Sequence, residues 1–311
     1  MSEKEQMRPL AYSIVLFIAA AAAVAVSMPE AGLLAGDYGW QTALFFLLFG
    51  VFSIATGFPH PVFGHVSFDR VAQVASILVL GPVDAAWING VASFIYPLYR
   101  LTKGVSLPAV IMASLHNAGL MTLAVLSGGL LYTYLGGPVP LTALDFRTGT
   151  LLFVLVLAMQ IVNDAGMMVT LWLRNMNPRA VFNLFTAVVE FFSAAVGVVL
   201  AIAFINEPLP FFALLLLVLA AGMFVIMKYA LMRYRLERLV DERTEELRVQ
   251  AVEFERQATH DKLTQLPNRR YADDFMEQQL ELANRNAHTG AVALADIDHF
   301  KQINDDYSHA K

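Results

Sequence analysis

The sequence contains no cysteine, which excludes disulfide bonds and thiolate metal sites. It is also poor in charge, because charged residues make up 15% of the 311 residues while hydrophobic residues make up 57%. Mean hydropathy is +0.57, and ordinary soluble domains carry about 25% charged residues. This composition excludes an ordinary soluble domain and predicts a polytopic membrane protein.

Charged residues are sparse before Lys228 and dense after it, so the formal net charge of -5 conceals an asymmetry along the chain. We therefore expect a membrane region followed by a soluble tail. The first apolar run, from Leu10 to Met28, has no clear cleavage site and precedes further apolar runs, which indicates a retained helix. The sequence has no basic stretch with interleaved aromatic residues, so we expect no nucleic-acid partner.

A membrane helix needs about 20 mostly apolar residues. Six runs fit this length, at residues 10–28, 40–58, 108–135, 149–173, 180–205 and 209–232. Residues 71–99 form two more apolar runs separated by Gly81-Pro82. Because proline lacks an amide hydrogen and clashes with the preceding turn, this region is predicted to be a re-entrant or spanning hairpin.

Basic residues favour the cytoplasmic side of a membrane. The segments assigned to that side are the N-terminus, the segment after Lys228, and the loops that carry His60, His65 and Arg70, Arg100 and Lys103, and Arg174 and Arg179. These assignments agree only if residues 71–99 enter and leave on the cytoplasmic side. A single crossing there would instead give seven spans and an external N-terminus.

The predicted fold is an α-helical polytopic bundle of six spans plus the hairpin, up to eight crossings, integral to the cell (inner) membrane. Its C-terminus is expected in the cytoplasm.

After the bundle, a set of residues is spaced by steps of four and three: Leu236, Val240, Arg243, Leu247, Gln250 and Phe254. This heptad-like stripe predicts a parallel dimeric coiled-coil stalk, with a solvated surface helix as the alternative.

Two runs near the C-terminus resemble a known enzyme family. Residues 260–270 read HDKLTQLPNRR, and residues 296–307 read DIDHFKQINDDY. Together they closely resemble the opening of a GGDEF domain, the diguanylate cyclase module. The resemblance covers roughly the last fifth of the chain and stops at Lys311, before the place where the family carries its GG(D/E)EF signature. We interpret the chain as a membrane sensor with a truncated output enzyme.

The local sequence predicts part of an α/β domain in this segment. Pro267 ends one helix, and Asn268 is placed to cap the next, which begins near Arg269. Residues 271–286 are amphipathic, with Phe275, Met276, Leu280 and Ala283 on one side. Residues 291–295 form a short apolar run that predicts a strand ending at Asp296.

The resemblance implies that two GTP molecules are joined to cyclic di-GMP with the help of Mg²⁺, at a site formed between two copies of the domain. It also implies that Asp296 and the Ile297 carbonyl bind metal. The amides of Phe300 and Lys301 would hold phosphate, and Asn304 would read guanine. Without the family, an Asp-x-Asp-x-Phe-Lys run is more often a solvated loop.

The family's other guanine-reading and metal-binding residues would lie beyond Lys311, and Ser308 stands where the family usually has glycine. No complete catalytic set is therefore expected in this chain. We expect the intact protein to be a diguanylate cyclase and the 311-residue chain to be inactive.

Several polar residues fall inside the predicted spans. They are His116, Asn117, Gln160, Asn163, Asp164 and Glu190. Gln160, Asn163 and Asp164 share one helical face, and ionisable groups at membrane depth tend to face a cavity or the bundle interior. They predict a pocket for an unknown small ligand or ion, with hydrogen bonding between packed helices as the alternative.

The sequence divides into a cytoplasmic N-terminus (1–9), a transmembrane sensor domain (10–232), a signalling helix (233–258) and the start of a GGDEF domain (259–311). The membrane part weakly resembles LytS-type multi-span receptor domains through Asp69-Arg70, Gly81-Pro82, Gly90 and Arg100. We favour a homodimeric receptor that regulates a cyclase. The alternatives are a transporter-like protein and a regulatory, non-catalytic GGDEF domain attached to a phosphodiesterase.

Overall fold

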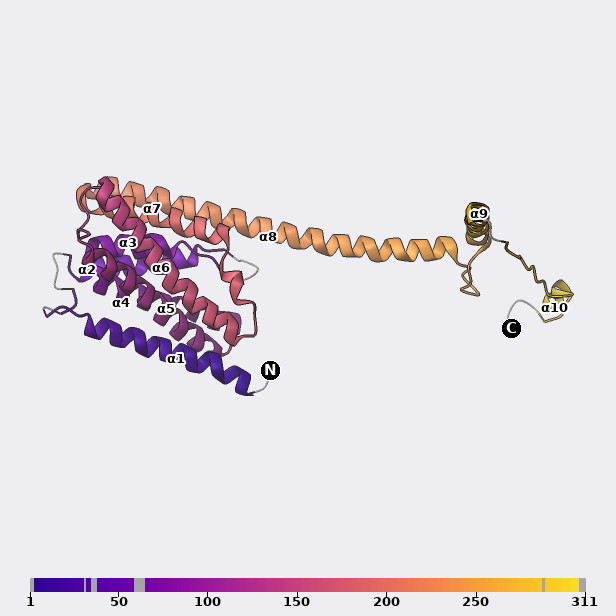
Figure 1. Ribbon diagram of the computed structural model, residues 1–311, viewed down its shortest axis with the longest axis horizontal. Helices are drawn as coiled ribbons and strands as arrows, with labels where there is room; N and C mark the ends of the chain where they lie inside the picture. Colours follow the sequence, from indigo (N-terminus) through magenta and orange to yellow (C-terminus); the bar gives the residue numbers. More distant parts are fainter. Residues whose placement is uncertain (1–2, 31, 35–37, 59–64, 287–288, 308–311) are drawn as a thin grey trace. The chain divides into compact units, whose positions relative to one another are not determined.

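The computed structural model (Figure 1) describes every residue except 1–2, 31, 35–37, 59–64, 287–288 and 308–311. The chain divides into two compact units, Met1–Leu236 and Glu237–Lys311, and each is described by itself. The described helices of the first unit are α1 (Glu3–Val26), α2 (Trp40–Ala55), α3 (Asp69–Leu80), α4 (Pro82–Ile95), η1 (Tyr96–Lys103), α5 (Leu107–Tyr134), α6 (Phe146–Leu173), η2 (Pro178–Val181), α7 (Leu184–Asn206) and the first part of α8 (Leu209–Thr259).

Each of the six predicted spans coincides with a helix of the first unit. Among the residues that the structure describes, five helices are long and apolar enough to cross a membrane: α1 from Arg8, α5, α6, α7 and α8. The sixth, α2, has 16 residues, or about 24 Å at 1.5 Å per residue, against a hydrocarbon core of about 30 Å. A membrane bundle is consistent with these lengths, and the count of crossings stays a prediction.

The predicted break at Gly81-Pro82 is confirmed. Gly81 has φ +91 and lies between α3 and α4, and Pro82 is the first residue of α4. Only glycine adopts such a φ readily. The two short helices also interact directly, because Asn89 Nδ2 donates to Ser76 Oγ at 2.8 Å. At 12 and 14 residues, each helix is shorter than the membrane core.

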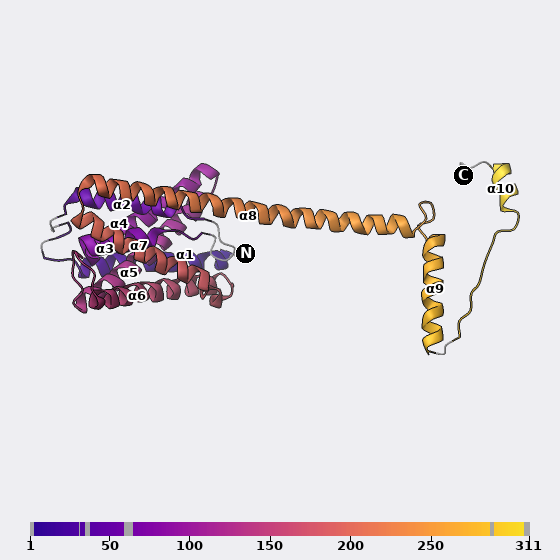
Figure 2. The same cartoon turned by 90° about the horizontal axis from the view of Figure 1, so that it is seen from above.

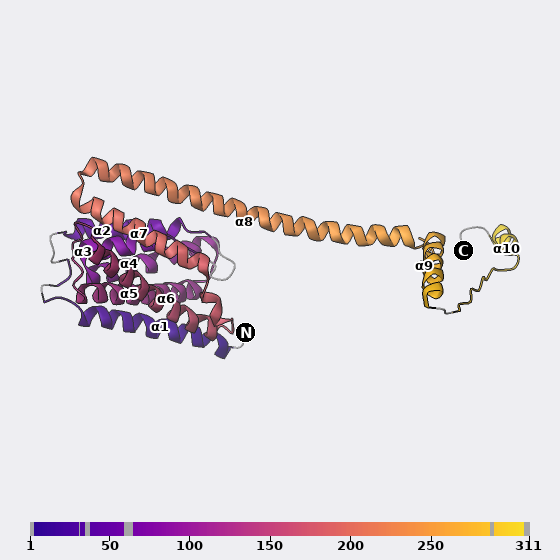
Figure 3. The same ribbon diagram turned by 45° about the horizontal axis from the view of Figure 1, so that its top comes forward.

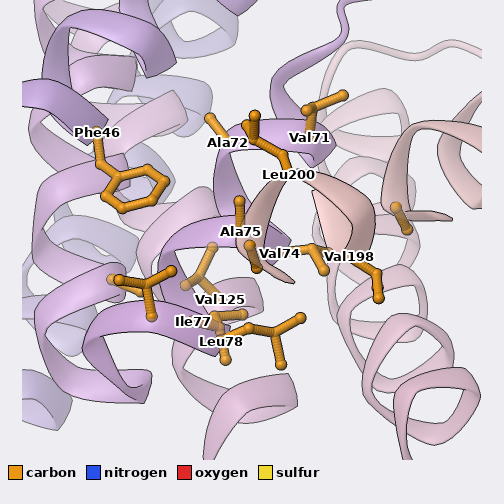
Figure 4. Packing of buried hydrophobic residues seen from close by; sticks show 14 of the residues in the cluster. Phe46, Val71, Ala72, Val74, Ala75, Ile77, Leu78, Val125, Val198 and Leu200 are labelled. Carbon is orange, nitrogen blue, oxygen red and sulfur yellow. The ribbon is translucent and has the colours of Figure 1, made fainter. Parts of the chain in front are cut away.

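Helix α3 lies in the centre of the bundle, and every residue from Arg70 to Val79 is buried. Figure 4 shows its apolar side chains packed beside Val198 and Leu200 of α7 and Val125 of α5. A Cβ added at Gly197 of α7 would lie 2.7 Å from the Val71 carbonyl oxygen. Glycine at this position therefore permits the close approach of α7 to α3, as small residues do in membrane bundles.

Helix α8 differs from the other long helices in how little it buries. Within the described residues of α8, only Phe212 and Met223 are buried. Figures 2 and 3 show its first part running back along the bundle in the direction opposite to α7. Since the two helices are joined by two residues, α8 leaves the membrane unit at the end where α7 begins. Its apolar face is free for lipid or for a second copy of the chain.

The second unit contains the end of α8, α9 (Arg269–Asn286) and α10 (Phe300–Tyr307). The predicted helix start is confirmed, because α9 begins at Arg269 and the Tyr271 amide donates to Asn268 Oδ1 at 3.0 Å. The turn before it is held by Asp261 Oδ1, which accepts from the amides of Leu263 and Thr264 at 3.0 and 2.9 Å. These hydrogen bonds hold down the pKa of the Asp261 carboxyl.

The predicted strand at residues 291–295 is wrong in this structure, since these described residues belong to neither a strand nor a helix. A strand is stabilised by hydrogen bonds to a neighbouring strand, and no strand occurs in the described parts of this unit to supply them. The α/β character of the segment therefore stays a prediction. So does the coiled coil, whose Leu236, Val240, Leu247 and Phe254 side chains are all exposed in this single chain.

Candidate functional sites: a polar cavity and a partial nucleotide site

A cavity of about 590 Å³ lies inside the membrane unit. Its walls come from the first two turns of α3 and α7, the end of α4, the helix η1, the first half of α5 and the second half of α6, with single residues from α1, α2 and η2. All the polar residues singled out in the spans line it, namely His116, Asn117, Gln160, Asn163, Asp164 and Glu190. Helices far apart in the sequence thus bring these side chains to one cavity.

Arg70 is the centre of the hydrogen bonding in this cavity. Its side chain is 3% exposed, and its Nε lies 2.6 Å from Glu190 Oε2. Its Nη1 donates to Gln73 Oε1 at 3.2 Å, and its Nη2 donates to Gln160 Oε1 at 3.3 Å. One guanidinium therefore joins α3, α6 and α7, using the several donors that arginine presents in a fixed plane.

The network continues in both directions from Arg70. Gln160 Nε2 donates to Asp164 Oδ1 at 2.8 Å, and Gln73 Nε2 donates to Asp69 Oδ2 at 2.7 Å. A charged side chain at the centre of a membrane helix costs about 2.5 to 3.5 kcal/mol on insertion scales. The Arg70–Glu190 pair offsets this cost for both of its members. The side-chain amides of Gln160 and Gln73 hold the carboxylates of Asp164 and Asp69 in place.

The placement of Arg70 corrects one prediction from the sequence. We expected Arg70 in a cytoplasmic loop, whereas it is the second residue of α3 and is buried against Glu190. The error arose because a lone arginine before an apolar run is typical of a membrane boundary. The signal that could have found it is Glu190 inside a predicted span, which needs a cation, together with Gln73 one turn after Asp69 and Arg70.

The two predicted loop histidines differ in what the structure describes. His65 is exposed, lines the cavity, and has Nε2 2.9 Å from the Ile54 carbonyl oxygen. His60 lies outside the described residues. Deeper in the bundle, His116 Nε2 lies 3.3 Å from Thr170 Oγ1, and its ring centroid is 5.8 Å from that of Tyr12. His116 therefore already has protein neighbours on two sides.

The cavity reaches the surface at one end of the bundle. Tyr99, Arg100 and Arg174 line it and are exposed. They lie in η1 and just after α6, at the end where α7 begins and α8 leaves the unit. By the distribution of basic residues this is the end predicted to face the cytoplasm.

The residues predicted for nucleotide binding lie on or beside the short helix α10. Asp296, Ile297, Phe300 and Lys301 are exposed. Asp296 Oδ1 accepts from the Ile297 amide at 2.9 Å, and the Ile297 carbonyl accepts from the Phe300 amide at 3.3 Å. The side chain of Asn304 and all of Ser308 lie outside the described residues.

These residues agree in chemistry with a magnesium site but do not complete one. No group of three His, Cys, Asp or Glu side chains in the described part of the chain is placed to hold a metal ion. Asp296 and the Ile297 carbonyl are hard oxygen ligands of the kind that Mg²⁺ prefers, and Mg²⁺ takes further ligands from water and substrate phosphates. The remaining protein ligands would have to come from other residues.

Comparison with known proteins places this segment in a family. Residues 258–311 match the family model described as diguanylate cyclase, GGDEF domain. The C-terminal segment is thus a GGDEF-family sequence, related to the diguanylate cyclases. No solved structure matches the chain at a significant level.

Three curated relatives from Pseudomonas aeruginosa match the same segment. The bifunctional diguanylate cyclase/cyclic di-GMP phosphodiesterase MucR is 48% identical over 52 residues, which is 17% of this chain and 8% of MucR. Diguanylate cyclase DgcP is 44% identical over 52 residues, 17% of this chain and 8% of DgcP. Diguanylate cyclase TpbB is 44% identical over 54 residues, 17% of this chain and 12% of TpbB. The matched segment therefore covers only a small part of each relative.

Proposed function

We propose that this protein is a membrane-integral receptor that regulates a cytoplasmic diguanylate cyclase through the helix α8. The observation that carries the proposal is a single chain containing a bundle of apolar helices around a polar cavity and, after α8, a GGDEF-family segment. The receptor lies in the cell (inner) membrane with several spans, and its C-terminus is in the cytoplasm, where GTP is available.

A connection from the cavity to α8 runs through α7. Glu190 lies on α7 and is held by Arg70 of α3, and α7 is joined to α8 by two residues. A ligand that changes the Arg70–Glu190 contact would bias the position of α7 and therefore of α8. A conformational change of this kind requires a ligand that binds one arrangement more tightly than the other.

The output is the formation of cyclic di-GMP from two GTP molecules at a site shared by two copies of the chain. Dimerisation through α8 is supported by its exposed apolar face, which continues from the membrane part into Leu236, Val240 and Leu247. Mg²⁺ supplies the charge that neutralises the triphosphates, and Asp296 and the Ile297 carbonyl would hold it. The amides of Phe300 and Lys301 lie at the start of α10, where phosphate is favoured.

The test is a chimera in which residues 1–257 precede the complete GGDEF domain of DgcP. Four residues are inserted between Glu242 and Arg243 in one variant, and seven in a matched control. Seven residues restore the heptad phase of a coiled coil, whereas four rotate it.

We expect the four-residue insertion to change cyclic di-GMP output about fivefold or more, while the seven-residue insertion keeps the output of the parent chimera. Equal output from both insertions and from the free GGDEF domain would show that the membrane unit does not control the enzyme. The 311-residue chain itself is expected to form no cyclic di-GMP in the same assay.

A further inference from the structure

Most of the charged side chains that line the cavity have a partner in the protein or lie at a helix end. The acidic, basic and histidine residues in its lining are His65, Asp69, Arg70, Arg100, His116, Asp164, Arg174 and Glu190. Arg70 and Glu190 form an ion pair at 2.6 Å. Asp69 lies in the first turn of α3 and accepts from Ser67 Oγ and Gln73 Nε2, a position where a carboxylate also interacts favourably with the helix dipole.

The two exposed arginines are accounted for by their positions. Arg100 lies in the last turn of η1, and Arg174 is the C-terminal cap of α6. Cations are favoured at helix C-termini, and basic residues mark the cytoplasmic end of membrane helices. Both side chains reach solvent, so neither needs a ligand to satisfy its charge.

Asp164 differs from these charged residues, because within the described residues it has no direct ion pair and it does not lie at a helix end. It lies within α6, nine residues before Leu173, or about 14 Å from the end of the helix at 1.5 Å per residue. Its carboxylate accepts from Gln160 at 2.8 Å and also from the side chain of Asn163. Among the residues that the structure describes, no ion pair within 4.0 Å is found for Asp164.

The space beside Asp164 is large enough for an organic molecule. The volume of about 590 Å³ falls inside the range of about 300 to 1,000 Å³ that is usual for small-molecule pockets. Asn163 and Asn117 also line the cavity, and the amide oxygens of both side chains are further acceptors for a donor group, besides the N–H groups that they carry. The wall around Asp164 thus presents several acceptors and one carboxylate that Arg70 reaches only through Gln160, without a direct ion pair in the described part of the chain.

We propose that the cavity binds a small organic cation whose ammonium group donates to Asp164. The ligand enters from the end lined by Tyr99, Arg100 and Arg174, which is the cytoplasmic end in the proposed orientation. The receptor would then report on a metabolite with an amine group inside the cell. The signalling role of this ligand rests on the proposed function, whereas its binding to Asp164 does not.

The test is thermal unfolding of the 311-residue chain in lipid nanodiscs with n-butylammonium chloride as the probe. Sodium chloride and sodium butyrate at equal ionic strength are the comparison salts. Asp164→Asn removes the proposed ligand charge and keeps the side-chain shape, and Glu207→Gln removes one charge at the exposed C-terminal cap of α7.

We expect n-butylammonium to raise the unfolding temperature of the wild type and of Glu207→Gln in a saturable way, by about 5 °C near saturation. Asp164→Asn should show no rise beyond that in sodium chloride. An equal rise in Asp164→Asn, or a rise with butyrate and none with n-butylammonium, would overturn the proposal. The latter result would mean that the arginines define an anion site.

A second measurement uses only the wild type and so does not depend on the folding of a variant. n-Butyltrimethylammonium carries the same charge but no N–H donor, so it should stabilise the chain less than n-butylammonium. Equal stabilisation by the two cations would contradict hydrogen bonding to Asp164. Because neither measurement uses cyclase activity, a negative result leaves the insertion test of the proposed function standing, and the reverse also holds.

Discussion

The two units of this chain satisfy their polar groups in different ways. In the membrane unit, α3 is buried from Arg70 to Val79, and its one guanidinium has partners on α3, α6 and α7. In the C-terminal unit, no residue of α9 is buried, and Phe275 and Leu280 are 49% and 64% exposed. A helix forms its backbone hydrogen bonds within itself, whereas a strand needs a neighbour. A helix such as α9 can therefore form without a neighbouring segment, whereas residues 291–295 cannot form a strand by themselves.

The largest expected effect is at Arg70. Arg70→Met removes the cation from Glu190, whose side chain is 18% exposed, and this should lower the free energy of unfolding by about 3 kcal/mol, the low end of the range for breaking a buried pair. Arg70→Met combined with Glu190→Gln should recover most of this loss, since no unpaired charge remains. Thermal unfolding in detergent, followed by tryptophan fluorescence, measures both.

The matched control is Arg238→Met in the C-terminal unit. Arg238 and Glu242 form an i,i+4 pair at 3.2 Å whose side chains are 73% and 57% exposed. An exposed pair of this kind contributes about 0.5 kcal/mol or less. Equal losses at Arg70 and Arg238 would show that the Arg70–Glu190 pair is not buried in the membrane unit.

The next effect concerns two glycines on neighbouring membrane helices. Gly197→Ala places a Cβ 2.7 Å from the Val71 carbonyl oxygen, and such overpacking should cost about 1 to 3 kcal/mol. Gly222→Ala on α8 meets nothing within 4 Å and should stabilise α8 by up to about 1 kcal/mol through helix propensity. Changes of the same sign in the unfolding temperature would contradict the difference in packing between α7 and α8.

A smaller and local effect is expected at the cap of α9. Asn268→Ala removes the acceptor for the Tyr271 amide and should destabilise the start of the helix by about 1 kcal/mol, whereas Asn268→Asp should retain the cap. Amide hydrogen exchange at residues 269–273 measures this. Equal protection in the two variants would mean that Asn268 does not cap the helix.

The smallest effect is the pH dependence of the turn before α9. Hydrogen bonds from Thr264 and Leu263 hold the pKa of Asp261 below its ordinary value of about 3.8. A depressed pKa in the folded state means that its contribution is present above the unfolded pKa and is lost as pH falls through the folded value. Carbonyl NMR of the labelled chain should therefore find Asp261 titrating below 3.8, and Asp261 titrating above it would be contrary to this geometry.

Much of the fold could be predicted because its causes are local. Runs of apolar residues are long enough to identify α1, α5, α6 and α7, and Gly81-Pro82 breaks α3 from α4 through the backbone properties of the two residues. The start of α9 follows in the same way from Asn268. These features depend on neighbours in the sequence, so one sequence is enough to find them.

The remainder depends on residues far apart in the sequence. The sequence shows that Asp164 and Glu190 are costly in a membrane, but it does not show that Arg70 connects them. Arg70 is 120 positions from Glu190 and 90 positions from Gln160, which in turn contacts Asp164. The strand expected at residues 291–295 failed for the same reason, because its pairing partner is not specified by the run itself. Nothing in the sequence alone places the cavity mouth beside Tyr99.

The most direct test of the account is the cyclic di-GMP output of the chimera of residues 1–257 with the DgcP GGDEF domain. The double variant Arg70→Met with Glu190→Gln removes both charges of the buried pair without leaving either one unpaired. At equal expression and equal unfolding temperature, we predict a change in output of about fivefold or more, because α7 loses its polar link to α3. Output equal to that of the parent chimera would contradict control of the enzyme by this network.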